Sequence, residues 1–249
     1  MRAILTYHSL DDSGSPVSIA PDVFRQHVRW LAAGPVRVVA LTTLLHDDEP
    51  GDAVAITFDD AFANFATLGA PVLREHGMRA TIFAVSDHVG GTNAWNGLHD
   101  ERVPTLPLCD WDSLGALSAS GFEIASHTRR HADLSTLDVA AIEDEIGGSC
   151  ERIRGELGVA VSSFCYPYGG VNAGVADVAR RHVALAVTTE LRTLGARDDV
   201  HLLPRIDMYY LRDAGRLEAW GSAAFRRRLW LRGRARGLRA LMARGNGRA

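Results

Sequence analysis

Short apolar segments alternate with longer amphipathic segments along most of this chain. The strand-like segments cover residues 3–7, 37–41, 53–58, 80–85, 122–125, 163–166 and 184–187. Apolar residues at helical spacing separate most of them. Strands that alternate with helices pair in parallel through right-handed crossovers, so about seven such units predict a closed or nearly closed α/β barrel.

Proline and glycine residues mark where the predicted helices begin and end. Pro21 stands at a first helical position and is followed by apolar residues at helical spacing. Glycine in the left-handed conformation commonly follows the last turn of a helix. Three further helices are therefore predicted at 61–76, 112–120 and 138–157, ending before Gly77, Gly121 and Gly158.

Charge is distributed unevenly along the chain. The chain has 249 residues, 47% of them apolar, which is ample for one large core. Every basic residue is an arginine, and residues 216–249 carry 10 Arg and one acidic residue, against 17 Arg and 29 acidic residues in 1–215. We predict a single barrel domain at 1–215 and an Arg-rich helical tail at 216–249.

Acidic and histidine side chains follow two of the predicted strands, at the end where active sites of parallel barrels lie. Asp59 and Asp60 come directly after the third strand, and His127 and His131 follow the fifth. Adjacent carboxylates at the end of a buried strand are costly unless they bind something. Alternation points the two carboxylates in different directions, so one can ligate a metal while the other faces a substrate.

Two histidines four residues apart can converge on one ion, and with one carboxylate they form a His₂Asp set. Three protein ligands leave a coordination position open for water, as in catalytic zinc sites. The alternatives are a turn or helix cap for the aspartates, with Asp60 as an N-cap, and ordinary surface positions for the histidines. The occurrence of both pieces at strand ends favours the metal site.

Three segments carry a resemblance to a known family. TFDD (57–60), SHTRRH (126–131) and FCYPYG (164–169) closely resemble the first three motifs of the polysaccharide deacetylase family, also called the NodB-homology family or carbohydrate esterase family 4. The similarity runs from about residue 2 to 210. It implies a distorted (β/α)₇ barrel that binds Zn²⁺ or another divalent metal such as Co²⁺ or Ni²⁺.

The same resemblance implies roles for individual residues. Asp59 would be the general base. Asp60, His127 and His131 would be the metal ligands. Tyr168, in the third motif, would contribute its backbone N–H to the oxyanion of the tetrahedral intermediate.

The third motif departs from the family pattern. Cys165 stands where the family usually has an arginine that contacts the base. We hypothesise that Arg205 supplies the missing cation, the alternative being a surface arginine near a strand edge. The usual Asp-Trp fourth motif is also absent, and VTTE (187–190) occupies its approximate place.

The usual LxLxH segment, which ends in an acid histidine, is absent from the end of the chain. The chain opens instead with ILTYH (4–8), which looks like the circularly permuted branch of the family that includes poly-N-acetylglucosamine deacetylases. First and last strands can be neighbours in a closed barrel, so moving this strand preserves the site. His8 is therefore the candidate general acid, the alternative being a histidine that caps a core strand.

These features predict a metal-dependent hydrolase that removes N-acetyl groups from an amino-sugar-containing poly- or oligosaccharide or glycolipid. Two alternatives are an amide hydrolase of the same scaffold acting on a small non-sugar amide, and a degenerate carbohydrate-binding protein. In the long connection at 86–109, Trp95 could stack on a sugar or pack within the loop. Trp111 is expected at the start of the next helix, as part of the core against which that helix packs.

The compartment and further partners follow from composition. Three well-separated cysteines argue against a disulfide framework, and no secretory signal or membrane-spanning run is recognised, so we expect a cytoplasmic protein. The Arg-rich tail suits peripheral contact with an anionic membrane at its inner face, the alternative being a helix packed on the barrel or a partner chain. No nucleic acid partner is expected, because the body is acidic and carries no nucleic-acid motif.

Overall fold

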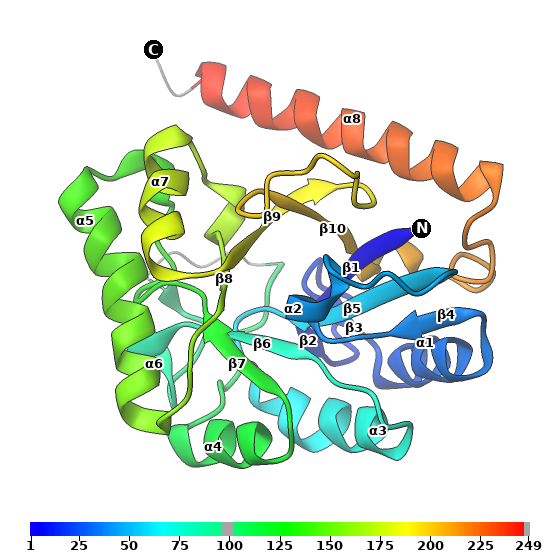
Figure 1. The fold of residues 1–249 in the computed structure, drawn as a ribbon, viewed down its shortest axis with the longest axis horizontal. Coiled ribbons are helices and arrows are strands. Elements are labelled where there is room, and N and C mark those ends of the chain that lie inside the picture. The colour runs from blue at the N-terminus through cyan, green and yellow to red at the C-terminus, as the bar shows by residue number, and fades with distance from the viewer. Residues whose placement is uncertain (96–101, 247–249) are drawn as a thin grey trace.

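The computed structural model describes the backbone of residues 1–95 and 102–246, and within these ranges the side chains up to residue 237. Figure 1 shows one ring of strands surrounded by helices, with a long C-terminal helix on the outside. The order of strands and helices along the chain follows the predicted alternation.

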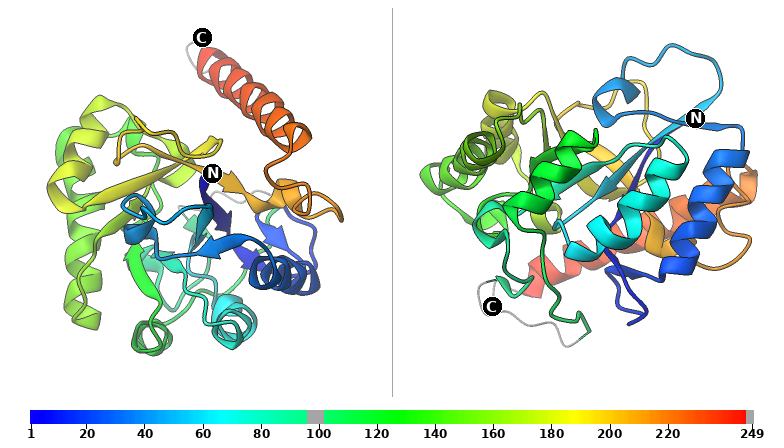
Figure 2. Two further views of the ribbon diagram at one scale, coloured as in Figure 1. Left: turned by 45° about the vertical axis from the view of Figure 1, so that its right-hand side comes forward. Right: turned by 90° about the horizontal axis from the view of Figure 1, so that it is seen from below.

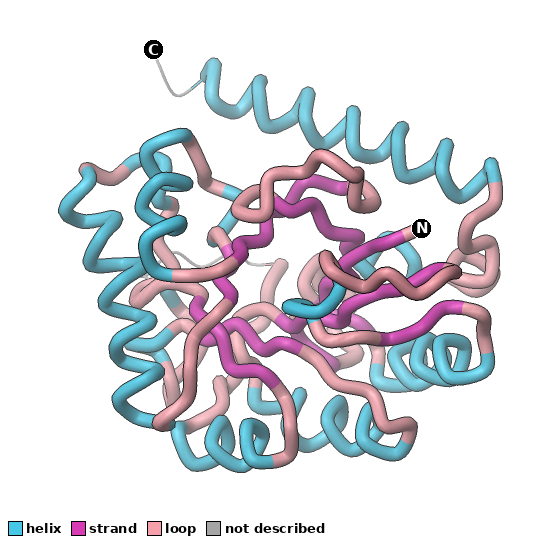
Figure 3. The backbone as a smooth tube through the Cα atoms, in the orientation of Figure 1, coloured by secondary structure: helices cyan, strands magenta, loops and turns pink. Residues whose placement is uncertain are grey.

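Seven parallel strands close into a barrel (Figure 3). β1 pairs with β5 along its whole length, from Arg2 opposite Ala53 to Tyr7 opposite Phe58, and with β10 on its other side. The first strand is thus inserted between a middle and a late strand. In ring order the strands are β1 (Arg2–Tyr7), β10 (Leu203–Asp207), β9 (Leu185–Leu191), β8 (Ser163–Cys165), β7 (Glu123–Ser126), β6 (Thr81–Ala84) and β5 (Asp52–Phe58).

The predicted barrel is confirmed, but the segment at 37–41 was wrongly predicted to be one of its strands, and the strand at 203–207 was not predicted. The segment at 37–41 gives only β4 (Val36–Val38), which pairs with the start of β5 outside the ring, and Leu41 begins helix α2 (Leu41–Leu44). β10 closes the barrel instead. It lacks an apolar run because Pro204 and Arg205 interrupt it, and Arg205 is nonetheless buried.

Helices cover the outside of the barrel (Figures 1 and 2). The glycines predicted to end helices all adopt positive φ, at 65° for Gly77, 89° for Gly121 and 67° for Gly158. The helices are α1 (Pro21–Ala33), the π-helix η1 (Phe65–Gly69) continuing into α3 (Ala70–Glu75), α4 (Trp111–Ala119), α5 (Val139–Glu143) continuing through the π-helix η5 (Asp144–Gly148) into α6 (Ser149–Leu157), α7 (Ala173–His182) and α8 (Ala223–Asn246). Shorter elements are β2 (Ser9–Leu10), β3 (Ser18–Ile19) and the single-turn 3₁₀ helices η2 (Ser86–His88), η4 (Leu134–Thr136), η6 (Pro167–Gly169) and η7 (Met208–Leu211).

Alternating strand residues divide the core into two layers. Leu5 and Ile56 belong to the larger cluster that includes the helix side chains, whereas their neighbours Ile4 and Ala55 belong to a second cluster with Phe83. This period of two is what a strand shows when one face lines a barrel and the other supports helices. Polar residues that replace apolar ones on the inner face near the ends of the strands therefore define the site.

The C-terminal helix α8 is attached to the barrel. Phe225 and Leu229 are buried in the same cluster as the barrel residues, and Arg236 forms an ion pair with Asp207 at 3.2 Å. The predicted division between residues 215 and 216 stays a prediction. Among the described residues, none of the helices combines the length and apolar character needed to span a bilayer.

Candidate functional site

A cavity of about 440 Å³ opens at the carboxyl ends of the barrel strands. The backbone ladder extends one residue beyond two strands, because Asp59 N–H donates to Tyr7 O and His127 N–H donates to Ala84 O, both at 2.9 Å. The residues that follow therefore turn into the cavity from fixed positions. Six of the predicted site residues line it: His8, Asp59, Asp60, His127, His131 and Tyr168.

Backbone strain is concentrated at this cavity. Five non-glycine residues in the described part of the chain have positive φ, and they are Asp60 (70°), Ala61 (56°), Thr128 (67°), His131 (59°) and Tyr168 (57°). Such conformations cost on the order of 1–3 kcal/mol each and persist where surrounding structure enforces them, commonly at functional sites. Because the helical segment after Asp60 begins beyond Ala61, the alternative of Asp60 as an N-cap is wrong.

Asp60, His127 and His131 converge on one point. Asp60 Oδ1 lies 3.5 Å from Nε2 of His127 and 3.3 Å from Nε2 of His131. This oxygen is buried and has no hydrogen-bond donor among the described residues. A buried carboxylate oxygen without a donor is unfavourable unless a cation completes it, so these residues fit a divalent metal ion.

The outer nitrogens of both histidines already have partners. His127 Nδ1–H donates to the backbone oxygen of Cys165 at 2.7 Å, and Tyr168 Oη lies 2.9 Å from Nδ1 of His131, where it can accept that N–H. This arrangement leaves both Nε2 lone pairs directed at Asp60, which is the usual way in which metal-binding histidines are oriented. Burial, reinforced by repulsion from His131, lowers the pKa of His127 to about 4, so its imidazole is neutral near pH 7.

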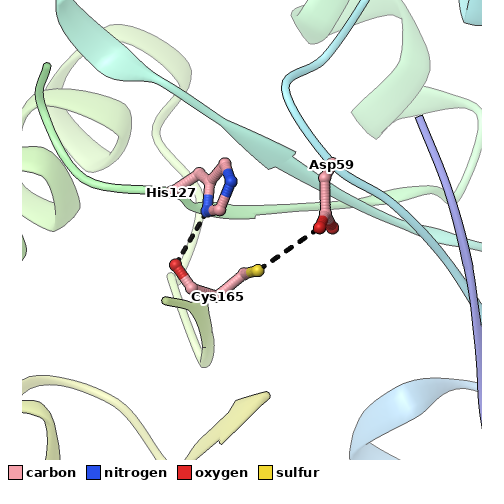
Figure 4. Close-up of side chains that lie close together, drawn as sticks. All are labelled: Asp59, His127 and Cys165. Carbon is pink, nitrogen blue, oxygen red and sulfur yellow. Dashed lines mark hydrogen bonds between the residues drawn. The ribbon is translucent and has the colours of Figure 1, made fainter. Parts of the chain in front are cut away.

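A second grouping of Asp59, His127 and Cys165 is close enough to suggest a metal (Figure 4). Its chemistry does not suit one. Burial raises the pKa of the Cys165 thiol well above its usual value, so the thiol stays protonated, and its S–H donates to Asp59 Oδ2 at 3.5 Å. Arg205 already places a positive charge against both Asp59 and Cys165.

Arg205 lies beneath the cavity, inside the barrel. Its guanidinium donates to both oxygens of Asp59 at 2.7 Å, its Nε donates to the backbone oxygen of Thr188 at 2.9 Å, and Nη2 lies 3.1 Å from Cys165 Sγ. Only 3% of Arg205 is exposed, so the alternative of a surface arginine is wrong. Burial alone would raise the pKa of Asp59, but the charge and hydrogen bonds of Arg205 outweigh it and hold the pKa well below its usual range.

His8 enters the cavity from the end of β1. Its Nε2 lies 3.7 Å from Asp59 Oδ2, and about a quarter of the side chain remains exposed (24%). Because β1 lies between β5 and β10, a histidine from the start of the chain reaches the site. Its role as an acid stays a prediction.

The two tryptophans singled out in the sequence are both packed. Trp95 lines the cavity but stacks on His131, with 4.5 Å between ring centroids, and is only 8% exposed. Loop packing therefore describes Trp95 better than an open sugar platform. Trp111 begins α4 and packs against the core, as expected.

One supporting residue was missed in the sequence. Glu145 in η5 is buried, and one of its carboxylate oxygens accepts the backbone N–H groups of Arg129 and Arg130, each at 2.9 Å. It thus fixes the loop that carries both histidines. The available signal was an acidic residue on the apolar face of an amphipathic helix, beside Ile142 and Ile146.

Comparisons with known proteins agree with this geometry. A model of the polysaccharide deacetylase family matches residues 46–186. YxkH of Bacillus subtilis, whose name as a polysaccharide deacetylase is provisional, is 25% identical over 82% of this chain and 70% of its own length. The poly-β-1,6-N-acetyl-D-glucosamine N-deacetylase of Staphylococcus epidermidis is 22% identical over 76% of this chain and 67% of its own length.

A solved structure gives the same fold. IcaB from Ammonifex degensii superimposes with a TM-score of 0.72 at 22% identity, over 89% of this chain and 97% of that one. The chain spans less than half the length of several other curated relatives that it matches. The matched region covers more than half of the chain and contains Asp59, Asp60, His127, His131 and Tyr168. The barrel, the site at its carboxyl end and the family match together show that this chain is a hydrolase that belongs to the polysaccharide deacetylase family.

Proposed function

We propose that this protein is a metal-dependent deacetylase that hydrolyses N-acetyl groups on an amino sugar within a poly- or oligosaccharide or glycolipid. The observation that carries the proposal is the buried oxygen of Asp60, which faces two histidine Nε2 atoms and has no donor among the described residues. A second carboxylate, Asp59, stands beside this set and is not needed for binding. A hydrolase needs such a base, whereas a carbohydrate-binding protein does not.

Asp60, His127 and His131 would hold the ion. Two imidazoles and a carboxylate suit Zn²⁺, and Co²⁺ or Ni²⁺ can occupy the same donor set. When bound, the ion would polarise the amide carbonyl and acidify a water molecule. The left-handed backbone at His131 and the hydrogen bonds that both Nδ1–H groups donate orient the histidines for this task.

Asp59 would accept the proton of the attacking water. Its two hydrogen bonds to Arg205 fix the plane of the carboxylate and keep it ionised at neutral pH. Cys165 leaves room for the guanidinium because a thiol is much smaller than the arginine usual at this position. Arg205 thus acts through Asp59, as a positioning residue.

His8 and Tyr168 would complete the reaction. His8 lines the cavity on the side of Asp59 and would protonate the departing amine. Tyr168 would donate its backbone N–H to the oxyanion, and its positive φ of 57° sets the direction of the peptide groups around it. Acetate and a free amino sugar would leave.

The substrate class is supported by the relatives and by the cavity. The S. epidermidis relative is named for an N-acetylated amino-sugar polymer. The cavity, at about 440 Å³, is within the range of roughly 300–1,000 Å³ that small ligand sites occupy. Asp59 and Asp60 both line this cavity, so the amide of an acetamido sugar bound there would be within reach of both carboxylates.

Acetate release provides the test. The purified protein is incubated with N-acetylglucosamine oligomers, the monosaccharide, nucleotide sugars and small cyclic amides. The substrates that are hydrolysed distinguish a sugar deacetylase from an amide hydrolase that acts on small non-sugar amides. Asp59→Asn and His8→Ala should each lower turnover by about 10²–10⁴-fold. Metal-stripped protein should be inactive and recover with Zn²⁺ or Co²⁺.

Metal affinity is measured separately, by competition with a chromogenic chelator. Asp60→Ala should bind Zn²⁺ far more weakly than wild type, whereas His8→Ala should bind it normally. Full activity in metal-stripped protein, or full turnover in Asp59→Asn, would contradict the proposal.

A cytoplasmic location and peripheral contact with a membrane stay proposals. Leu231 on α8 is exposed and lies among arginines, which supports contact with an anionic lipid surface. Sedimentation with vesicles that contain an anionic lipid should recover wild type and recover less of Leu231→Glu. Wild type that remains in the supernatant would end the membrane proposal.

A further inference from the structure

A second cavity, of about 650 Å³, adjoins the candidate active site. It is lined by the loop after β8, the carboxyl half of β9 and one face of α8. Tyr168 and Thr189 line both cavities, so the two are immediate neighbours. The C-terminal helix therefore forms a wall of a groove that lies directly beside the site.

The wall is held in place by close packing. Trp230, Gly233, Arg234 and Gly237 line the groove, at the spacing of one helical face. A Cβ atom at Gly233 would lie 2.8 Å from the backbone oxygen of Leu191, so only glycine lets α8 approach β9 this closely. The buried side chains at the start of α8 fix the same position.

The groove presents aromatic faces together with polar groups. Tyr168 and Trp230 are among the few large apolar residues exposed in the described part of the chain, at 61% and 57%, and both line this groove. The guanidinium of Arg234 lies 5.1 Å from the centre of the Trp230 ring and supports it on one side. Glu190 accepts hydrogen bonds from Arg192 on both carboxylate oxygens, at 2.8 and 3.0 Å, and the remaining lone pairs of this carboxylate can accept from sugar hydroxyl groups.

These groups match a sugar chain. A pyranose ring packs its C–H face on an aromatic ring, and its hydroxyl groups bond to planar polar side chains. The groove is lined by Glu190 and by the arginines Arg192, Arg234 and Arg236. Arg192 is paired with Glu190 and Asp198, and Arg236 is paired with Asp207, so two of the three arginines are already neutralised and the groove does not favour a polyanion. The neighbouring cavity along α8 is different, because five arginines line it, namely Arg216, Arg227, Arg228, Arg232 and Arg236.

We propose that this groove binds the sugars that flank the residue being deacetylated, with Trp230 as their stacking platform. This inference rests on the proposed function and extends it, because it makes the enzyme selective for a chain over a single sugar. The tail helix is then part of the substrate site.

The test compares chain lengths. Acetate release is measured on β-1,4- and β-1,6-linked N-acetylglucosamine oligomers, from the monosaccharide to the pentasaccharide. Wild type should show kcat/KM rising with length in at least one series. Trp230→Ala should lower kcat/KM for the pentasaccharide about tenfold and change the monosaccharide value by less than about twofold.

Leu231→Ala is the matched control. Leu231 is the next residue on α8, is 53% exposed and lines the neighbouring arginine-rich cavity but not this groove. It should behave like wild type at every length. Equal effects of Trp230→Ala on short and long substrates, or no effect on either, would overturn the proposal.

A binding measurement separates this inference from the proposed function. Calorimetry measures binding of the pentasaccharide to Asp59→Asn and to the double variant Asp59→Asn/Trp230→Ala. The double variant should bind about tenfold more weakly than Asp59→Asn alone. Binding that depends on Trp230 without acetate release by wild type would reject the deacetylase and keep the groove. Acetate release with Trp230-independent binding would reject the groove and keep the deacetylase.

Discussion

Arg205→Met removes a buried charge while keeping most of the side-chain volume. In the wild type the guanidinium makes two hydrogen bonds of 2.7 Å to Asp59 and one of 2.9 Å to Thr188 O. Asp59 is also buried, so the substitution leaves a carboxylate without its counter-charge inside the barrel. Breaking a buried pair in this way costs about 3–5 kcal/mol, which corresponds to a fall in Tm of about 6–20 °C for a chain of this size.

The same change should alter the pH dependence of activity. Arg205 holds the pKa of Asp59 below its usual range against the opposing effect of burial. Without the cation the pKa rises, so the acid limb of the kcat/KM profile moves to higher pH. The loss is about tenfold for each unit by which the new pKa exceeds the assay pH, and it shrinks as the pH is raised.

The wild-type pair also sets a stability window. Because the pKa of Asp59 is lower in the folded than in the unfolded chain, its stabilisation is complete above about pH 4 and is lost as the pH falls through the folded-state pKa. Urea denaturation of wild type and Arg205→Met should therefore converge in strong acid.

Arg37→Met is the matched control for this experiment. Arg37 also makes a two-pronged contact with an aspartate, at 3.2 and 2.7 Å to Asp47, but it lies outside the barrel. It should leave the acid limb unchanged. Asp59→Asn combined with Arg205→Met should be more stable than Arg205→Met alone, because no buried anion remains. An unchanged Tm and acid limb in Arg205→Met would refute the reasoning.

Two further perturbations test other parts of the molecule. Burial lowers the pKa of His27 to about 4, so the contribution of His27 to wild-type stability should fall by up to about 1.4 kcal/mol per pH unit as the pH drops from about 6.5 towards 4, while the unfolded chain takes up the proton. Urea denaturation of His27→Gln should show a flatter profile in that window, and an equal slope would contradict this role. Glu145→Ala removes the acceptor for the N–H groups of Arg129 and Arg130 and should weaken Zn²⁺ binding about 10–100-fold in chelator competition, whereas Glu145→Gln should retain most of the affinity. Wild-type affinity in both variants would show that the loop holds its shape without this carboxylate.

The sequence determined the architecture and the ends of its main elements. Strand and helix periods are local properties of the chain, and glycine is required wherever a helix ends in the left-handed conformation, as at Gly77, Gly121 and Gly158. The Asp-Asp and His-xxx-His pieces were visible because each follows a buried strand, and parallel strands bring their carboxyl ends together.

Only the tertiary structure decided how these pieces are completed. Neither the burial of Arg205 against Asp59 nor the anchoring of the histidine loop by Glu145 follows from sequence spacing, because each partner is far away along the chain. β10 was missed for the same reason. Arg205 interrupts its apolar pattern, and a buried arginine in a strand is expected only once its partner Asp59 is known. Strand and helix periodicity is a local property of the sequence. A buried charge such as that of Arg205 is stable only because an oppositely charged side chain from a distant part of the chain lies beside it, and the two come together only in the folded barrel.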